Sequence, residues 1–401
     1  MTLRQSIMLM AAPMLAVLPS PALAQEEEPR AETNGEGEDE RTSAFGLDLL
    51  YKADLVGVAA GGGTRGARFL DNIDLMAAVD LDRAAGWEGA SAYVGVLSNA
   101  GARPNDIAGT LQGVNNIEVG GPDAVLYQAW LQQRFAGDRG SILVGKYDLN
   151  SEFYANPSAA ALIAPAFGIG SELAATGPNG PSIFPQTDLG IRLRLEDRRH
   201  YVQAAVIRAP RGVADEGGPR SALFIAEAGL RGRTAITVGG WTYSDRQPRI
   251  VPPGVTLGPD TAASHGLYAL VEQDLAGEAD KMGYWCAFLR MGLSDGLTTP
   301  FADGMQVGVT GHGVLPSRPE SLLSIGFATA GLSRAYRRAN PADEPPLTRS
   351  ESTIELTYSD RVARFLTLQP DVQYVHRPSG LRDAPGVVVL GLRAIVDWKI
   401  H

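Results

Sequence analysis

The sequence has little of what commonly holds a fold together or anchors it in a membrane. Among 401 residues there is one cysteine, Cys286, so no disulfide can form within the chain. Past the amino terminus no run reaches the roughly 18 apolar residues that a membrane-spanning helix needs. The nearest run, 155–170, is interrupted by Pro157 and Pro165. The fold must therefore depend on backbone pairing and packing, and any membrane crossing must use strands.

An excess of basic residues is also missing. Residues 25–40 contain eight acids and one base, and residues 41–401 contain 33 Lys and Arg against 37 Asp and Glu. This balance provides no basic face for a nucleic acid, so we expect no nucleic-acid partner. The acidic stretch has almost nothing apolar to bury, and we expect 25–43 to be a disordered, solvated linker.

Metal-binding patterns are absent from the histidines. None of the five forms a pair at a metal-ligand spacing, and we expect no cofactor, no metal and no catalytic residue. The histidines are His200, His265, His312, His376 and His401.

The first 24 residues have the pattern of a secretory signal. Arg4 gives the positive start, residues 7–18 are mostly apolar, and Ala22-Leu23-Ala24 offers a cleavage site. We therefore expect export, with cleavage after Ala24 and residues 44–401 forming one domain.

Past residue 44 the dominant signal is a period of two. In 187–196, four aliphatic residues alternate with polar or small ones, which gives one apolar and one polar face to a strand. These aliphatic residues are Leu189, Ile191, Leu193 and Leu195. Similar patterns occupy 71–81, 127–135 and 354–359, although Asp71 falls on the apolar face of its run and Gln133 breaks its own.

Thirteen further runs bring the total to about 17, and Gly, Pro, Asn and Asp fill nearly every gap. They are 47–58, 90–97, 141–147, 200–207, 222–230, 235–243, 267–273, 283–290, 305–314, 321–328, 364–369, 372–376 and 387–400. Their length and the even strand number of bacterial barrels predict an all-β fold, an antiparallel transmembrane β-barrel of about 16 strands, with 18 as an alternative. A soluble β-sandwich also alternates, but its strands are shorter.

The segment from Asn150 to Gln186 interrupts this rhythm. Its alanine-rich part, 158–164, is compatible with a short helix, and the Gly and Pro around it indicate a long loop. In a barrel we expect this loop to fold inward and narrow the lumen.

Several segments, in this order, resemble one family. They are Asp71-Asn72-Ile73-Asp74-Leu75, Gly86-Trp87-Glu88-Gly89, Leu111-Gln112-Gly113-Val114-Asn115-Asn116-Ile117-Glu118, Leu126-Tyr127-Gln128-Ala129-Trp130, Gln133-Arg134-Phe135, residues 144–154, Phe184-Pro185 and residues 189–193. The stretch in which they lie is about a third of the chain, and it resembles the carbohydrate-selective porins of the OprB type.

The resemblance implies a barrel of about 16 strands that passes mono- or small oligosaccharides by facilitated diffusion across the outer membrane of a Gram-negative bacterium. Its partners would be sugars, outer-membrane lipid and the barrel-assembly machinery, with monomer and trimer both open. One departure is the carboxyl end. The family favours an aromatic last residue, whereas this chain ends in His401.

A sugar pore needs hydrogen-bonding groups, an aromatic ring for stacking and a narrow point. The polar face of 127–135 supplies these types, and we expect it to face the lumen. This face holds Gln128, Trp130, Gln132 and Arg134. Trp130 is the candidate for stacking on sugar, and a place in the interfacial aromatic girdle is its alternative.

A second set of candidates occurs where 141–147 runs into the long loop. Lys146, Asp148, Asn150 and Glu152 lie two residues apart, as charges at a constriction would, and Arg192 and Arg194 follow the loop. Ordinary solvated lumen charge or cross-strand pairing is their alternative reading.

We expect no enzymatic activity. Two other classes stay open at this point, a periplasmic sugar-binding sandwich and a barrel-embedded lipid hydrolase, since a Ser and a His can meet across strands.

Overall fold

The computed structural model describes residues 43–399 apart from 178–179, 210–220, 253, 255–258, 280 and 341–346. The expected signal sequence, the expected linker up to residue 42, and the terminal Ile400 and His401 lie outside the described residues. Among the described helices, none combines the length and the apolar character required to traverse a membrane.

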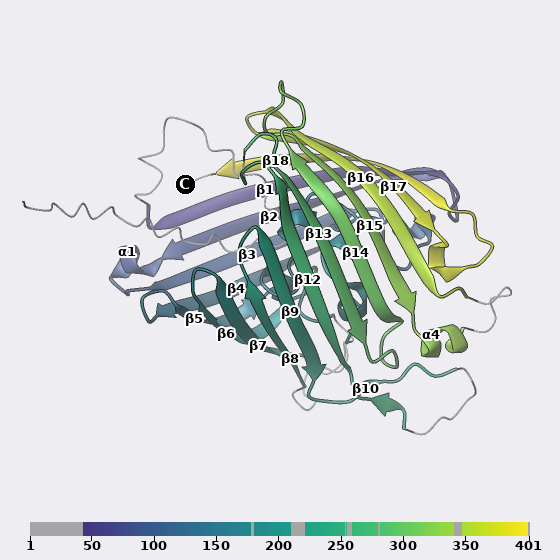
Figure 1. Ribbon diagram of the computed structural model, residues 1–401, viewed down its shortest axis with the longest axis horizontal. Helices are drawn as coiled ribbons and strands as arrows, with labels where there is room; N and C mark the ends of the chain where they lie inside the picture. Colours follow the sequence, from purple (N-terminus) through teal and green to yellow (C-terminus); the bar gives the residue numbers. More distant parts are fainter. Residues whose placement is uncertain are drawn as a thin grey trace, which may run out of the picture.

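Sixteen of the described strands close into a single antiparallel barrel, in which neighbours along the chain pair and β1 pairs with β18. Figure 1 shows the strands strongly tilted. They are β1 (Phe45–Ala60), β2 (Gly66–Asp80), β3 (Ala90–Gly101), β4 (Asp123–Phe135), β5 (Gly140–Tyr147), β6 (Asp188–Glu196), β7 (His200–Arg208), β8 (Ala222–Leu230), β9 (Thr234–Tyr243), β12 (His265–Ala276), β13 (Trp285–Ser294), β14 (Phe301–His312), β15 (Leu322–Leu332), β16 (Ser350–Ala363), β17 (Leu366–His376) and β18 (Val387–Lys399). Two short strands, β10 (Gln247–Pro248) and β11 (Thr261–Ala262), pair separately.

The predicted number of 16 strands is confirmed, and the soluble sandwich is wrong because the sheet closes on itself. About 17 runs become 16 strands because 364–369 and 372–376 form the single strand β17. This strand continues through Pro370, which lies opposite Leu392 of β18.

The alternation in β6 shows how the sequence specifies the two faces of the wall. Leu189 and Ile191 are 58% and 52% exposed on the outside of the barrel, whereas Arg192 between Ile191 and Leu193 is 1% exposed on the inside. A pattern of period two places aliphatic side chains towards lipid and polar ones towards the lumen.

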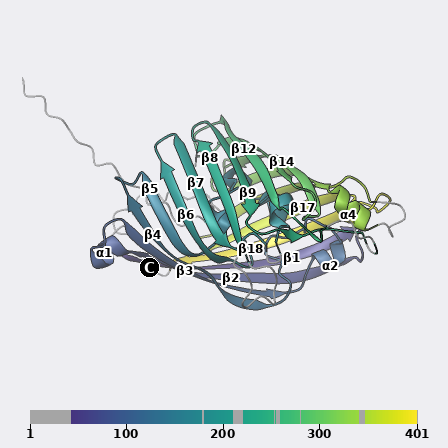
Figure 2. The same ribbon diagram turned by 90° about the horizontal axis from the view of Figure 1, so that it is seen from below.

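Outward aromatic residues lie near both ends of the barrel. Phe45, Phe135 and Trp398 are exposed near the short-turn end, and Phe69 and Tyr374 near the long-loop end. Two such girdles fit the two interfaces of a bilayer. Figure 2 shows α1 (Leu81–Ala85) at the short-turn end and α2 (Asn105–Ala108) and α4 (Arg334–Ala339) at the other.

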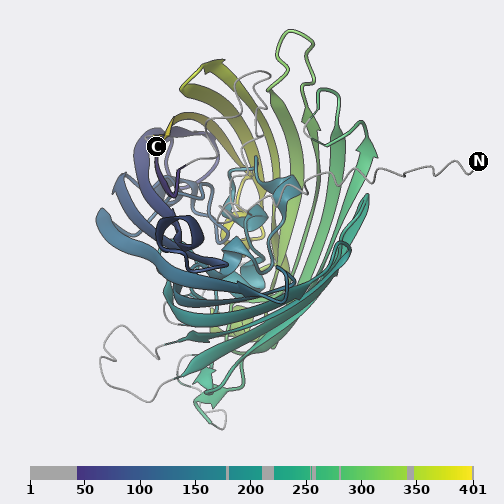
Figure 3. The same ribbon diagram turned by 90° about the vertical axis from the view of Figure 1, so that its left-hand side faces the viewer.

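Two long segments fold into the barrel. Residues 102–122 contain α2, and residues 148–187 contain three 3₁₀ turns and α3 (Ser171–Ala174). Figure 3, seen from the short-turn end, shows blue-to-teal segments inside the ring of strands. The predicted inward loop is therefore present. Residues 158–164, which are compatible with a short helix, form none in the structure, where Pro157–Ala159 makes a 3₁₀ turn.

Candidate functional site

The polar face of β4 lies inside the barrel, as the alternation predicts. Leu131 is 37% exposed on the outer face, while Gln128 is 7% exposed on the inner face. A β-bulge shifts the register between β3 and β4 at this point, so that Gly95 pairs with Gln128 and Val96 pairs with Leu126. Tyr127, which strict alternation places on the apolar outer face, is therefore turned inward.

Tyr127 and Asp148 close the start of the long loop. The Tyr127 hydroxyl donates to Asp148 Oδ2 at 2.6 Å, and the Asn150 amide donates to Asp148 Oδ1 at 2.9 Å. Burial raises the pKa of Asp148 to about 6 in spite of these hydrogen bonds, which act in the opposite direction. By accepting the Asn150 amide, Asp148 caps the 3₁₀ turn Leu149–Ser151.

Trp130 stacks on Tyr93 of the neighbouring strand. Their ring centroids are 5.2 Å apart and the ring planes differ by 18°. Tyr93 is 5% exposed, and Trp130 stays partly exposed on the inner side of the wall. Of the two readings of Trp130, the geometry favours the lumen over the outer girdle.

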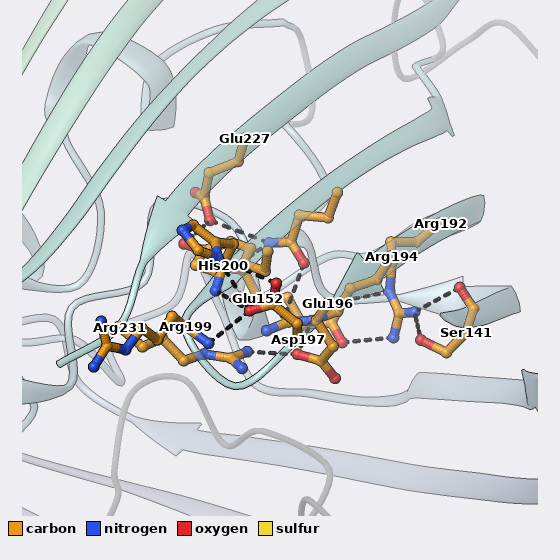
Figure 4. A network of polar contacts seen from close by, with 12 residues as sticks. Ser141, Glu152, Arg192, Arg194, Glu196, Asp197, Arg199, His200, Glu227 and Arg231 are labelled. Atoms are coloured by element: carbon orange, nitrogen blue, oxygen red, sulfur yellow. Dashed lines mark hydrogen bonds and ion pairs between the residues drawn. The ribbon is translucent and has the colours of Figure 1, made fainter. Parts of the chain in front are cut away.

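Arg192 is the centre of a polar network that reaches across three strands and into the loop (Figure 4). Its Nε and Nη2 atoms each donate to the Glu152 carboxylate at 2.6 Å. Arg192 also donates to Ser141 Oγ at 2.6 Å and to Gln132 Oε1 at 2.7 Å. Arg192 and Glu152 therefore form an ion pair, which agrees with the alternative that these charges are paired inside the barrel.

Arg194 belongs to a second network, nearer the short turns. It donates to Glu196 at 3.0 Å and to Gln203 at 2.8 Å, and its guanidinium lies 4.8 Å from the ring centre of Tyr201. Arg231 reaches the same Glu196 at 2.6 Å. Arg134 points inward on β4, and it is partly exposed.

Lys146 does not lie in the lumen. It pairs with Ala129 of β4 and with Leu189 of β6, whose side chain is on the outer face, and paired residues point to the same side of a sheet. Its placement on the lumen face is therefore corrected. The error came from running one alternation through the end of β5 and into the loop, where strand geometry ends.

Asn150 is also corrected as a lumen residue. It is 1% exposed, and its side-chain amide donates to the Phe153 carbonyl within the loop. Lys146, Asp148, Asn150 and Glu152 were predicted together, and of these Glu152 is the residue that pairs with Arg192 of β6.

The sequence reasoning missed the groups that hold the long loop in place. Glu355 of β16 accepts the backbone amides of Ile163 and Ala164, the second at 2.9 Å. Glu227 of β8 accepts the Tyr154 amide at 2.9 Å, and Glu272 of β12 accepts the Ser158 amide at 2.9 Å. A carboxylate that receives backbone amides fixes a loop without a helix or strand. Glutamates at inward positions of several strands were the available signal.

Side chains of the barrel wall also donate hydrogen bonds to backbone carbonyls of the long loop. Arg290 of β13 donates to the carbonyls of Ala166 and Gly168, and Gln369 of β17 donates to that of Ala161 at 2.6 Å. Residues 148–187 are thus bonded to strands on the far side of the barrel from β4.

The other inward segment is held in the same way. Glu351 of β16 accepts the amides of Leu111 and Gln112, and Arg393 of β18 pairs with Asp54 of β1 at 2.8 Å. Arg393 also donates to Asn116 of the segment at 2.6 Å. Both segments therefore depend on buried charge at inward positions.

One Gly-x-Ser-x-Gly pattern, residues 292–296, occurs at the end of β13. Ser294 Oγ donates to the Phe301 carbonyl at 2.7 Å and accepts the Gly296 amide at 3.2 Å. A nucleophile elbow requires a strand, a sharp turn and a helix, whereas here the turn leads to strand β14. Ser294 therefore closes a turn.

Comparison with known proteins gives a family for most of the barrel. The model of the family described as "Carbohydrate-selective porin, OprB family" matches residues 64–397. Porin B of Pseudomonas aeruginosa is 22% identical over 404 residues and covers 88% of this chain and 88% of its own. Putative porin QuiX of Acinetobacter baylyi is 22% identical over 380 residues, covering 82% and 84%.

Solved structures agree on the fold. The high pH structure of Pseudomonas putida OprB superimposes with a TM-score of 0.78 at 19% identity, over 88% of this chain and 94% of that one. OmpT of Vibrio cholerae gives a TM-score of 0.51 at 11% identity, over 89% and 99%. Because the family model spans most of the barrel, the protein is an outer-membrane sugar porin, and its chain belongs to the OprB family of carbohydrate-selective porins.

Proposed function

We propose that mono- and small oligosaccharides diffuse along the inner wall made by β3, β4 and β6, past the exposed part of Trp130. The observation that carries this proposal is the Tyr93–Trp130 stack, because it holds one large aromatic ring rigidly against the wall with part of its surface free. Sugars present apolar ring faces that stack on such a surface.

Polar groups beside the ring support the same path. Gln132 and Arg194 follow on neighbouring inward positions, Arg134 lies nearer the mouth, and each is partly exposed. These side chains exchange hydrogen bonds with sugar hydroxyls and with water at similar strength, so a sugar can enter and leave without a deep energy minimum.

The long loop limits the passage from the opposite side. Its hydrogen bonds to Glu227, Glu272 and Glu355 hold its backbone against the far wall. The Glu152–Arg192 pair is then a neutral clamp where the loop meets β6, and we propose that it sets the width of the passage rather than the charge of what passes.

Liposome swelling with sugars of increasing size tests this function. Swelling in neutral mono- and disaccharides, with a cut-off at larger oligosaccharides, is expected. Reconstituted protein that admits salts but no sugar of any size would contradict it. The control is the same lipid with protein that has been heated and has lost its barrel.

Three further proposals concern enzymatic activity, lipid and assembly. We propose that the chain has no hydrolase activity, since Ser294 is committed to its turn. We also propose that the apolar outer face contacts outer-membrane lipid and that the barrel-assembly machinery inserts the chain. Assay of the purified protein with a chromogenic ester, with Ser294→Ala as control, tests the first of these.

A further inference from the structure

Arginines are concentrated in three turns at the short-turn end of the barrel. We call this set the arginine turns, and it consists of Arg139 between β4 and β5, Arg198 and Arg199 between β6 and β7, and Arg231 and Arg233 between β8 and β9. The same turns hold two acids, Asp138 and Asp197. Five positive charges therefore stand against two negative ones.

Backbone hydrogen bonds bring the three turns together. The Glu196 amide donates to the Arg139 carbonyl at 2.8 Å, and the Arg231 amide donates to the Arg199 carbonyl at 2.7 Å. Figure 4 shows Arg199 and Arg231 at the end of the polar network that lies away from Arg192. The arginines are therefore neighbours in space, along one stretch of the rim.

The nearby acids leave most of these arginines without a counter-ion. Glu196 is shared by Arg231 and Arg194. Asp197 accepts backbone amides that follow it in the chain. Four of the five arginines have no ion pair within the part of the chain that the structure describes, and all four are exposed. They are Arg139, Arg198, Arg199 and Arg233.

Arginines on another stretch of the same rim are paired. Arg318, in the turn between β14 and β15, lies 3.4 Å from Asp360 of β16. Arg361 of β16 lies 3.9 Å from Glu320 of that turn. The arginine turns therefore differ from this stretch in leaving their positive charge uncompensated.

The arginine turns begin where the outer apolar surface ends. Phe135 of β4 and Leu195 of β6 both pair with Gly140 of β5, so the three residues lie level on the outer face. The Phe135 ring lies over Gly140 and fills the space that a side chain would take there. Arg139 is the next residue beyond this apolar row.

This position coincides with the headgroup layer of a bilayer. A strand rises about 3.3 Å per residue, and headgroups extend about 5 to 8 Å beyond the hydrocarbon core on each side. Arg139 is one residue past its apolar row, and Arg231 directly follows Leu230, which is 46% exposed on the outer face. An arginine at this depth lies level with lipid phosphates, which a guanidinium binds through two parallel hydrogen bonds.

We propose that the arginine turns bind the phosphate groups of anionic phospholipid in the periplasmic leaflet of the outer membrane. Short turns of bacterial barrels face the periplasm, and clustered basic side chains are attracted to anionic headgroups. The inference rests on the proposed contact of the outer face with lipid and does not depend on the sugar path. Bound headgroups hold this side of the barrel at one depth in the bilayer.

Photo-crosslinking of the reconstituted full chain tests the contact. The probe is phosphatidylglycerol with a photoactivatable headgroup, as a minor component of phosphatidylcholine vesicles, and mass spectrometry identifies the labelled peptides. We expect labelling of the arginine turns severalfold above that of residues 313–321, and its loss in 1 M salt, where the screening length falls to about 3 Å. Equal labelling of both stretches of the rim, or labelling that salt does not change, would overturn the proposal.

Two double variants with equal loss of charge locate the site. Arg199→Gln with Arg233→Gln removes two uncompensated arginines, and labelling of the turns should fall about fivefold for each arginine lost. Arg318→Gln with Arg361→Gln removes two paired arginines and should leave that labelling as it is. Arg199→Lys with Arg233→Lys keeps the charge and should retain most of it. A similar fall in the two glutamine variants, both run as heat-modifiable barrels, contradicts a site at the arginine turns.

Two further arms separate other ligands of the same charge. Excess glycerol phosphate that abolishes labelling would assign the turns to small soluble phosphates. Polyglutamate that binds the protein in neutral detergent, together with equal labelling by phosphatidylglycerol and phosphatidylcholine probes, would assign them to a soluble acidic partner. Either result sinks the lipid site. Sugar swelling tests the sugar path separately, because none of the substituted arginines belongs to that path.

Discussion

Arg192 of β6 holds Glu152 of the long loop through two hydrogen bonds of 2.6 Å, although 40 residues separate them in the chain. The arginine is 1% exposed and the glutamate side chain 18%. This pair fixes the point where the loop leaves the wall and turns across the lumen. In the passage that we propose, it therefore links the fold of the barrel to the width available to a solute.

Replacing Arg192 by methionine should loosen the loop without opening the barrel. Breaking a fully buried pair costs about 3–5 kcal/mol, and we expect less here because Glu152 is partly exposed. The measurable result is faster hydrogen exchange of amides 149–156 and noisier single-channel current. Adding Glu152→Gln to Arg192→Met removes the unpaired charge and should restore part of the protection, whereas unchanged exchange in Arg192→Met would show that the pair does not hold the loop.

Glu355→Ala should release the middle of the loop. Two buried amides, those of Ile163 and Ala164, lose their acceptor, at about 1–3 kcal/mol each. Ion conductance should then rise, because the loop no longer stays against the far wall. Ile354→Ala on the outer face of the same strand is the matched control and should leave conductance as it is. A rise in both variants would indicate a general loss of barrel stability.

Trp130→Ala should weaken sugar binding in the channel. Aromatic contacts of this kind contribute about 1 to 1.5 kcal/mol, so the sugar concentration that blocks half the current should rise roughly fivefold to tenfold. Leu131→Ala points the other way on the same strand and should have no such effect. If sugar block changes with Leu131 and not with Trp130, the proposed path is wrong.

The pH dependence of the loop should follow Asp148. Its pKa is raised to about 6, so the native loop binds a proton more tightly than the free chain does. The attachment should therefore weaken as pH rises from about 4 through 6, and be firmest below that range. Hydrogen exchange at residues 149–151 between pH 4 and 7 measures this, after correction for the intrinsic exchange rate.

Asp148→Asn provides the control for that titration. The asparagine oxygen still accepts the Asn150 amide, and its side-chain amide can donate to the Tyr127 hydroxyl oxygen in place of the bond that Asp148 accepts, so the turn should keep its protection. The pH dependence at residues 149–151 should be much reduced. An identical dependence in Asp148→Asn would assign the effect to another carboxyl group.

The sequence predicted the wall better than the lumen. Outward and inward faces of β6 follow from alternation alone, because lipid and water impose opposite demands on successive side chains. The same rule failed at Tyr127, where a bulge inserts a residue. Lys146 lies within β5, on the outer face with Ile142 and Val144, and it was misplaced because it was grouped with the loop residues that follow at a spacing of two.

The candidate site divides along the same line. The inward face of Trp130, Gln132, Arg192 and Arg194 was predicted because these residues lie within regular strands. Asn150 was misplaced because it lies in a loop whose path depends on distant partners. Its neighbours in space are set by hydrogen bonds such as those of Glu355, almost 200 residues further along the chain.

The sequence by itself determined the all-β fold, the apolar outer face of the strands and the resemblance to a porin family. Each of these depends only on local alternation or on short contiguous motifs. Only the tertiary structure decided which carboxylates receive the loop amides, which arginines meet at the mouth, and which ring of the wall keeps a free surface. Closure of the barrel brings residues hundreds of positions apart into contact, as it does for Asp54 and Arg393, and no local pattern records which pairs those will be.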